Sequence, residues 1–291
     1  MMTGNSGVIN YGGSMKIRQS AVGDGATVTV REKNRTSARR ADVGVITILG
    51  KEAGAVHEVL GLRQVSDSSL PFFEGTVAAQ GTNHRIVAIR ALEQGQRSTV
   101  VAFEQLRRHY NPAIVVLAGI GGGIHRDVKV RDVVVTTRVI YYDLRKETPH
   151  GRRRRGEELK APATTGHAVN SFFTAHGEPA KFPSLDGSGH FQVLPGPIGS
   201  GDAVIADAES EIIRYLKAYN DKILAVDMEA GGLTQAFHEQ DGPQIVRGWV
   251  VVRGISDDSS AGKNDDHQDL AARHAALTLR HLLPYLPAAS T

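Results

Sequence analysis

The chain has 291 residues, of which 41% are hydrophobic and 22% are charged, so it is long enough to bury the core of one large domain. Its 34 basic and 31 acidic side chains leave a formal charge of +3, and this surplus is too small to indicate a nucleic-acid partner. The absence of cysteine excludes disulfides and thiolate metal sites, and no histidine spacing is typical of a metal site either. No apolar run approaches the ~20 residues of a membrane span, and no signal peptide is evident, so we predict a cytoplasmic protein with no metal and no membrane partner.

The first forty residues differ in character from the rest of the chain. They contain six glycines, followed by a stretch rich in arginine. A segment of this composition buries too little apolar surface to fold alone, so we predict a Gly-rich, largely disordered tail over residues 1–40 and a folded domain over residues 41–291. Within the tail, Ala26–Val30 has the β propensity to add a strand to this chain or to another.

From Asp42 onward, apolar β-branched runs alternate with helix-like segments. We predict strands at residues 43–49, 85–92, 114–118, 133–142, 223–226 and 250–253. We predict helices at residues 52–60, 98–109, 168–176, 229–238 and 270–283. The stretch 147–193 is rich in Gly, Pro and charge, and we expect loops there around at least one helix. This order predicts an α/β fold of three layers, in which a central mixed β-sheet lies between helices.

Two short segments of the C-terminal half place acids at the ends of apolar runs. They are Val226-Asp-Met-Glu-Ala230 and Val251-Val-Arg-Gly-Ile-Ser-Asp257. An acid that leaves the C-terminal edge of a buried strand lies where open α/β sheets bind ligands, so both segments are candidates for a site. Two further segments, Ala118–Ile124 and Ser200–Val204, contribute a glycine run and a Gly-Asp-Ala loop.

In order and spacing, these four segments resemble the nucleoside phosphorylase and nucleosidase superfamily, most closely its methylthioadenosine/S-adenosylhomocysteine nucleosidase branch. The resemblance covers about Asp42 to Pro287. It implies a hydrolase that cuts the bond between a purine and its ribose, without a cofactor and as a homo-oligomer, a dimer being favoured. Because such a reaction passes through an oxocarbenium-like state, it requires an acid for the leaving base, a carboxylate for the ribose hydroxyls and a group that activates water.

The resemblance assigns the two catalytic roles to Asp257 and Glu52. Asp257 falls on the general acid that protonates purine N7, and the alternative is that Ser256, Asp257 and Asp258 cap the following turn. Glu52 falls on the glutamate that activates water in the nucleosidase branch, and the alternative is a helix-start glutamate favoured by the helix dipole. The Gly-Asp-Pro turn of the phosphorylase branch is absent, which favours hydrolysis, although Lys51 and Arg253 are able to attract an anion.

The same resemblance assigns ribose binding to Met228 and Glu229, because a carboxylate offers two acceptor oxygens to the adjacent 2′ and 3′ hydroxyls. The alternatives are a methionine that fills the core and a glutamate in the first turn of a helix. Val204 stands where relatives carry an aromatic residue that stacks on adenine, and Tyr142 is a candidate to supply stacking instead. Ser200, in the same segment as Val204, is a further candidate binding residue.

The glycine run has two interpretations. By resemblance, Gly119 and Ile120 approach the substrate closely, and Ile120 replaces a Ser or Thr that is common in the nucleosidases. Alternatively, a glycine-rich turn after a strand is compatible with an NAD-binding fold, and Asp143 follows about twenty residues later. Asp143 lies beyond a second predicted strand, which makes this the minor alternative.

Arg152–Arg155 is the strongest run of charge in the chain. Its usual meaning is a solvated loop. The alternative is a clamp for the phosphate of a 5′-nucleotide, because arginine forks match phosphate geometry. The arginine run and the segment Gly262-Lys-Asn-Asp265 both resemble phosphorylase-like domains of bacterial defence effectors, which degrade nucleotides.

We therefore predict an enzyme that hydrolyses a purine nucleoside or nucleotide and releases the purine base. Adenine is the base that we expect first, and residues 41–291 form the catalytic domain. A purine nucleoside phosphorylase and a noncatalytic module that senses nucleosides or nucleotides are the alternatives. Release of free base separates catalysis from sensing, and phosphate dependence separates phosphorolysis from hydrolysis.

Overall fold

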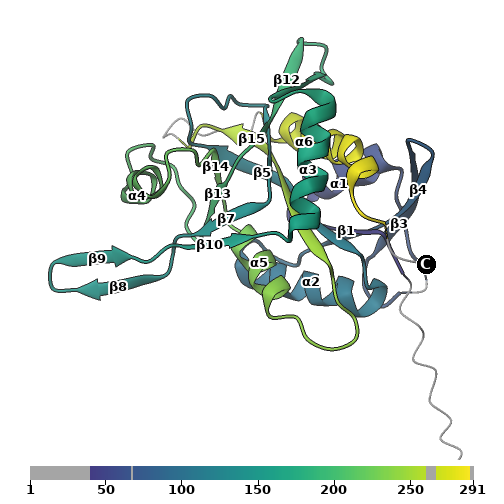
Figure 1. Ribbon diagram of the computed structural model, residues 1–291, viewed down its shortest axis with the longest axis horizontal. Coiled ribbons are helices and arrows are strands. Elements are labelled where there is room, and N and C mark those ends of the chain that lie inside the picture. The colour runs from purple at the N-terminus through teal and green to yellow at the C-terminus, as the bar shows by residue number, and fades with distance from the viewer. Residues whose placement is uncertain (1–39, 67, 260–266, 289–291) are drawn as a thin grey trace, which may run out of the picture. The chain divides into compact units, whose positions relative to one another are not determined.

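The structure is a computed structural model that describes residues 40–66, 68–259 and 267–288. Within these ranges, thirteen strands form one mixed sheet with helices on both faces, which confirms the predicted three-layer α/β fold (Figure 1). The predicted tail lies outside the described residues except for Arg40, and so does the segment 262–265.

The centre of the sheet is made of β5 (Ile114–Gly123) and β15 (Gly248–Asp257), which run parallel, with a bulge near the end of β15. On its other side β5 pairs in parallel with β1 (Val43–Thr47). Every residue of β1 and β15 is buried, because helices cover both faces of these strands, and this explains the apolar runs Val43–Ile46 and Trp249–Val252. Since the three strands point the same way, their carboxyl ends meet at one edge of the sheet.

The remaining strands extend the sheet on both sides of this centre. They are β2 (Arg63–Gln64), β3 (Phe73–Ala79), β4 (Thr82–Arg90), β6 (Val133–Thr136), β7 (Arg138–Tyr141), β10 (Glu157–Lys160), β11 (Ala180–Pro183), β12 (His190–Pro195), β13 (Ile198–Ser200) and β14 (Ala225–Asp227). β4 pairs with β1 in parallel, whereas β14 pairs antiparallel with the end of β5. The sheet is therefore mixed, as predicted.

The predicted single strand over residues 133–142 is wrong, because the chain breaks at residue 137 into β6 and β7. The hydroxyl of Thr136 donates to the carbonyl of Arg138 at 2.7 Å and accepts from its amide at 2.9 Å. These bonds turn the chain, so that β6 pairs with β12 and β15 whereas β7 pairs with β10 and β13.

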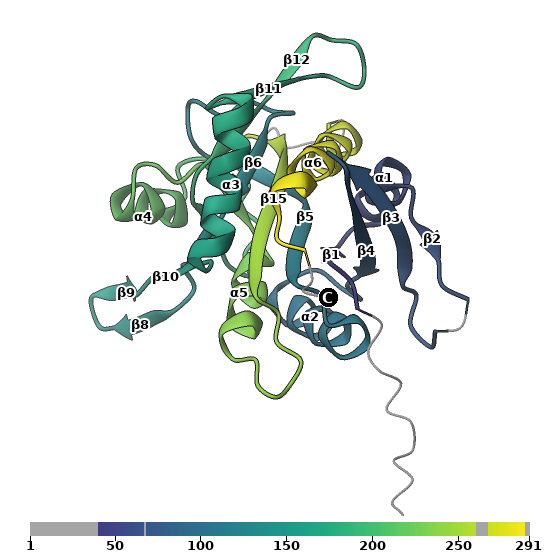
Figure 2. The same ribbon diagram turned by 45° about the vertical axis from the view of Figure 1, so that its right-hand side comes forward.

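The helices form the outer layers of the fold. They are α1 (Gly50–Leu60), α2 (Gln96–Tyr110), α3 (Ala163–His176), α4 (Glu211–Tyr219), α5 (Ala230–His238) and α6 (Gln268–Leu282). α1, α3 and α6 share one apolar core with the sheet, and α2 and α5 share the other. α1 and α6 pack against each other, and both views show them side by side (Figure 1 and Figure 2).

Other regions also differ from the sequence prediction, and β3 and β13 were not predicted. α4 was not predicted, and it begins at Ser210, whose hydroxyl accepts from the amide of Ile213 at 3.3 Å. The stretch 147–193 contains α3 as expected, but most of its remainder forms strands, including part of the hairpin of β8 (Arg145–Thr148) and β9 (Gly151–Arg154), which extends away from the sheet (Figure 1 and Figure 2). In the described ranges, no helix combines the length and apolar content that a bilayer crossing demands.

Candidate active site

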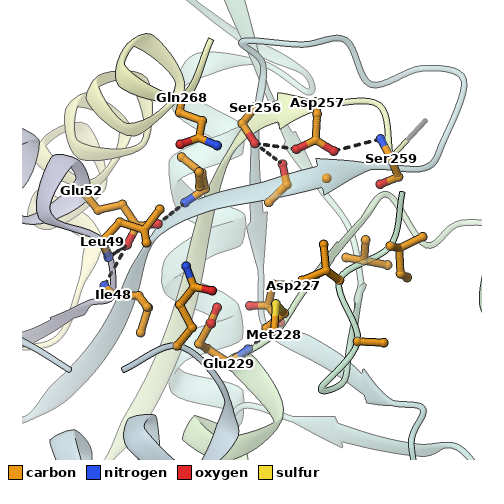
Figure 3. Close-up of a pocket in the computed structure, with 18 residues that line it drawn as sticks. Ile48, Leu49, Glu52, Asp227, Met228, Glu229, Ser256, Asp257, Ser259 and Gln268 are labelled. Carbon is orange, nitrogen blue, oxygen red and sulfur yellow. Dashed lines mark hydrogen bonds between the residues drawn. The ribbon is translucent and has the colours of Figure 1, made fainter. Parts of the chain in front are cut away.

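A pocket of about 260 Å³ opens where the carboxyl ends of β1, β5 and β15 meet. The end of β14 and the loop after β13 complete its wall. The carboxylate of Asp227 lines it at the end of β14. Three further carboxylates, those of Glu52, Glu229 and Asp257, line it from different elements, and Figure 3 shows these three on three sides of the cavity. The sequence places these acids far apart, and the fold brings them to one site.

Glu52 lies in the first turn of α1, and three backbone amides hold its carboxylate. Oε2 accepts from the amides of Ile48 and Leu49, and Oε1 accepts from the amide of Ile120, each at 2.8 Å. The first two bonds are those of a helix-start glutamate, but the third crosses to β5. Because the residue is only 2% exposed, its carboxylate faces the pocket in one fixed orientation.

Arg253 on β15 is fully buried and joins two carboxylates. Its Nε and Nη2 donate to Oδ2 of Asp227 at 2.9 and 2.6 Å, and Nη2 also donates to Oε2 of Glu229 at 2.9 Å. Burial lowers the pKa of Arg253, but Asp227, Glu229 and Glu52 together raise it above its usual value. Nη1 has no hydrogen-bond partner among the described residues, so one charged donor remains for a ligand or a water molecule.

Glu229 lies just before α5, with 6% of its surface exposed. Its Oε1 accepts from the amide of Gly95 at 3.0 Å. Gly95 has φ of 101°, a conformation that favours glycine, so a glycine is needed to aim this amide at the carboxylate. Burial raises the pKa of Glu229 to about 7, Arg253 opposes this effect, and Asp227 adds to it. The charge of this carboxyl group therefore changes close to neutral pH.

Asp257 is the last residue of β15, and two neighbours orient its carboxylate. Ser256 Oγ donates to Oδ2 at 2.8 Å, and the amide of Ser259 donates to Oδ1 at 3.0 Å. The second bond is the local turn contact that the capping alternative predicts. The side chain also lines the pocket, so the same conformation that closes the turn presents the carboxyl group to a ligand.

Two glycines of β5 allow side chains that line or support the pocket to approach the strand. A Cβ on Gly119 would lie 2.4 Å from Oε1 of Glu52 and 2.5 Å from Nη1 of Arg253. A Cβ on Gly122 would lie 2.3 Å from Oγ of Ser259 and 3.1 Å from Oδ1 of Asp257. Any other residue at either position would displace the carboxylates of the site.

The structure brings four of the eight predicted binding residues into the pocket lining. Met228, Glu229, Ile120 and Val204 line it, and Val204 is 62% exposed. Gly119 and Arg253 do not line it, but their atoms contact or support residues that do. The backbone amide of Ile120 donates to Oε1 of Glu52. This bond does not depend on the type of side chain at position 120.

The structure does not bring Ser200 and Tyr142 into the pocket lining. Both are fully buried. Ser200 Oγ accepts from Nε2 of Gln96 at 3.0 Å and from the amide of Gly231 at 2.9 Å, so it joins β13 to α2 and α5. Tyr142 packs in the apolar cluster beneath α4, and burial raises the pKa of its hydroxyl.

Arg152–Arg155 also lies outside the pocket lining, in and just after the second strand of the β8–β9 hairpin. Arg154 is the buried member of the run. Its Nε and Nη2 donate to the carboxylate of Glu211 at 2.9 and 2.8 Å, and Nη1 donates to Oδ1 of Asp143 at 3.3 Å. This side chain joins the hairpin to α4 and is engaged within the chain.

The NAD-binding alternative is wrong. Gly119–Gly123 continues β5 to its end and does not form the strand-to-helix turn that holds a dinucleotide. Within the part of the chain that the structure describes, no group of three or more His, Asp or Glu side chains is arranged to hold a metal ion.

The sequence prediction missed several residues of the site. Asp227 was not assigned a role, although it ends β14, lies in the same segment as Glu229 and binds Arg253. Ser259, Gln94 and Gln268 line the pocket as well. Asp227 was recognisable as an acid at a strand end, whereas the glutamines lie at the starts of two helices and carried no comparable signal.

The fold and the pocket define an α/β protein with a pocket at the carboxyl edge of its sheet that buried carboxylates line. The chain belongs to the phosphorylase superfamily, whose sequence profile matches residues 42–285. A 5′-methylthioadenosine/S-adenosylhomocysteine nucleosidase of Actinobacillus succinogenes is 29% identical over 237 residues, which cover 79% of this chain and 94% of that protein. The nucleosidase of the same name from Bacillus licheniformis is 27% identical over 192 residues, or 64% of this chain and 76% of that protein.

Solved structures share the fold at lower identity. The 5′-methylthioadenosine/S-adenosylhomocysteine nucleosidase of Neisseria meningitidis, in complex with methylthio-immucillin-A, has a TM-score of 0.62 and 22% identity, covering 83% of this chain and 97% of that one. Futalosine hydrolase of Helicobacter pylori has a TM-score of 0.65 and 15% identity, covering 85% of this chain and 98% of that one.

Proposed function

We propose that the protein is a purine nucleosidase, which hydrolyses the N-glycosidic bond of a purine nucleoside or nucleotide and releases the base, adenine above others. The observation that carries this proposal is the convergence of Glu52, Glu229 and Asp257 on one pocket. The names of the relatives, all of them nucleosidases or hydrolases, support it. Each of these carboxylates supplies one of the three groups that the reaction requires.

Glu229 is the group that holds the ribose. Oε1 and Oε2 of the ionised carboxylate have lone pairs for the 2′ and 3′ hydroxyls in addition to their bonds with Gly95 and Arg253. Met228 lines the pocket beside it and provides an apolar surface for the sugar.

Asp257 is the group that protonates N7 of the leaving purine. Ser256 Oγ and the amide of Ser259 orient its carboxyl group, so that the side chain loses little conformational freedom when the base binds. Ile205 and Val226 line the same pocket and offer apolar contact to the ring faces of a base.

Glu52 is the group that positions and activates the attacking water. Its Oε1 lies next to Nη1 of Arg253, since both atoms face Gly119, and a water molecule between them would donate to the carboxylate and accept from the guanidinium. The backbone amides of Ile48, Leu49 and Ile120 hold the carboxylate still.

The charges of the pocket favour water over phosphate as the nucleophile. Glu52 stands at the place from which the nucleophile approaches, and a carboxylate there repels a phosphate anion. Arg253 is already engaged by Asp227 and Glu229. A phosphorylase needs cations at this position, and this chain instead places an acid there.

The test is release of free base from a panel of purine nucleosides and nucleotides, with and without inorganic phosphate. We expect release at the same rate in both conditions. A strict phosphate requirement would indicate a phosphorylase, and tight binding without release would indicate a sensing module.

The proposal includes a homodimer and a cytoplasmic location. Val204 is an apolar side chain at the pocket that is 62% exposed, as a residue covered by a second copy would be in an isolated chain. Light scattering measures the mass in solution, and a monomer at assay concentration would contradict this part of the proposal. Fractionation of the producing cells tests the location.

A further inference from the structure

The first turn of α5, which begins directly after Glu229, is held by side chains from other elements. The first amides of a helix have no partner in the helix itself, so other groups accept from them. The amide of Gly231 donates to Oγ of Ser200 at 2.9 Å, and the amide of Gly232 donates to Oε1 of Gln96. The helix start that carries Glu229 is therefore fastened from outside.

Gln96 makes two of the contacts at this point with a single carboxamide. Its Oε1 accepts from Gly232, and its Nε2 donates to Oγ of Ser200 at 3.0 Å. The donor and the acceptor are both used, so an apolar side chain of similar size cannot replace it. Gln96 is the first residue of α2, and α2 lies beside α5 in both views (Figure 1 and Figure 2). The carboxamide thus joins the starts of two neighbouring helices.

The backbones of the two helix starts also meet closely. A Cβ on Gly232 would lie 2.2 Å from the carbonyl oxygen of Gln96, and a Cβ on Gly231 would lie 2.9 Å from its Oε1. Only glycines in the first turn of α5 leave room for this approach. The start of α2 therefore has one position against α5.

The residue before Gln96 holds the carboxylate that we assign to the ribose. The amide of Gly95 donates to Oε1 of Glu229 at 3.0 Å, and the carbonyl oxygen of Gly95 accepts from the hydroxyl of Thr99 at 3.1 Å. Gly95 is thus bonded on both sides, and its next neighbour is fastened to α5. The contacts of Gln96 therefore determine where the amide of Gly95 meets Glu229.

We propose that Gln96 is a positioning residue for the reaction, which holds the amide of Gly95 against the carboxylate of Glu229 and so keeps that carboxylate directed at the ribose. Ser200 is its partner in this role, in place of the substrate contact that the sequence suggested. Neither Gln96 nor Ser200 lines the pocket, so the effect passes through Gly95. The inference rests on the proposed function, in which Glu229 binds the ribose.

The pKa of Glu229 distinguishes positioning from a merely structural role. Burial raises this pKa to about 7, Asp227 and Glu52 raise it too, and Arg253 and the bond from Gly95 lower it. Loss of the Gly95 bond alone would raise the pKa further, because the bond favours the ionised carboxylate. General loosening of the pocket would admit water and lower the pKa toward the usual value of a glutamate. The two effects have opposite signs.

The test is a titration of the full chain, in which ¹³C NMR follows labelled glutamate carboxyl groups and Glu229→Gln identifies the signal of Glu229. In Gln96→Met we expect the pKa of Glu229 to rise by about half a unit or more. The midpoint of the pH dependence of KM for base release should move upward with it. Gln105→Met, the same change further along α2 and outside the pocket lining, is the matched control and should alter neither.

An unchanged pKa in Gln96→Met, or a fall toward the usual value of a glutamate, would overturn the inference. If this variant does not fold, Ser200→Ala removes the acceptor of Nε2 of Gln96 and should raise the pKa of Glu229 in the same way. The titration needs no substrate, which separates this inference from the proposed function. Lack of base release from every purine substrate would overturn the nucleosidase, whereas an unchanged pKa in an active enzyme would overturn only the role of Gln96.

Discussion

Nη2 of Arg253 donates a hydrogen bond of 2.9 Å to Oε2 of Glu229, and both side chains are almost completely buried. In the proposed mechanism, this pair connects the carboxylate that holds the ribose with the guanidinium that faces the attacking water. It also means that the ionisation of Glu229 depends on a buried guanidinium, whose charge does not change at the pH of any assay.

The first prediction concerns pH. Because burial raises the pKa of Glu229 to about 7, the carboxyl group is protonated below that pH and ionised above it. Protonation removes an acceptor for the ribose hydroxyls, so KM should rise as the pH falls from 8 to 6. Glu229→Gln should raise KM at every pH and abolish this dependence, as measured by initial rates across the range. An identical pH profile of KM in the variant would assign the titration to another group.

The second prediction concerns the attacking water. Glu52→Gln should lower kcat by about 10²–10⁴ while substrate affinity stays within a few fold, because a water-activating base acts mainly in the transition state. Single-turnover kinetics and equilibrium binding separate the two effects. Glu58→Gln, on the exposed side of the same helix, is the control. Near-normal turnover of the Glu52→Gln variant would show that Glu52 only stabilises the start of α1 and does not activate water.

The third prediction concerns the leaving base. Asp257→Asn should lose most activity on purine substrates, since an amide keeps the hydrogen-bonding shape but cannot supply the proton. The loss should be much smaller for a ribosyl nitrophenolate, whose leaving group departs without protonation. Equal losses on both substrates would show that Asp257 organises the turn with Ser259 and takes no part in proton transfer.

The fourth prediction concerns the close approach at β5. Gly119→Ala would place a methyl group 2.4 Å from Oε1 of Glu52 and 2.5 Å from Nη1 of Arg253, so these atoms must move apart. We expect kcat to fall by about tenfold or more, because small displacements of catalytic groups have large effects on rate. Gly54→Ala on α1 is the control, since a methyl group there meets no atom of the described residues within 4 Å. Equal rates for the two variants would contradict the prediction.

The fifth prediction concerns the arginine run. Arg154→Ala removes hydrogen bonds to Glu211 and Asp143 and should lower the free energy of unfolding by about 1–3 kcal/mol. Arg153→Ala, its exposed neighbour on β9, should change the free energy of unfolding by less than about 0.5 kcal/mol. Urea unfolding measures both. A selective loss of AMP cleavage in Arg154→Ala, without loss of stability, would restore the phosphate-clamp interpretation.

The layers of the fold were predictable because the amino-acid composition of a segment indicates whether that segment is buried. Parallel strands that helices cover on both faces contain long apolar runs, so β1, β5 and β15 were recognisable in the sequence. Where pairing partners change, composition carries no signal. The run 133–142 is rich in β-branched residues on both sides of residue 137, so its composition hides the break between β6 and β7, which the hydroxyl of Thr136 stabilises.

The sequence by itself determined the candidate acids, because Glu52, Glu229 and Asp257 follow apolar runs and stand in recognisable motifs. Only the tertiary structure decided that they face one pocket, that Arg253 joins Asp227 to Glu229, and that Gln94 and Gln268 reach the same cavity. It also separated Ser200 and Tyr142 from that cavity. The physical reason is that a motif fixes the position of a residue along its own strand or helix, whereas the direction and neighbours of its side chain depend on how strands distant in sequence align at the edge of the sheet.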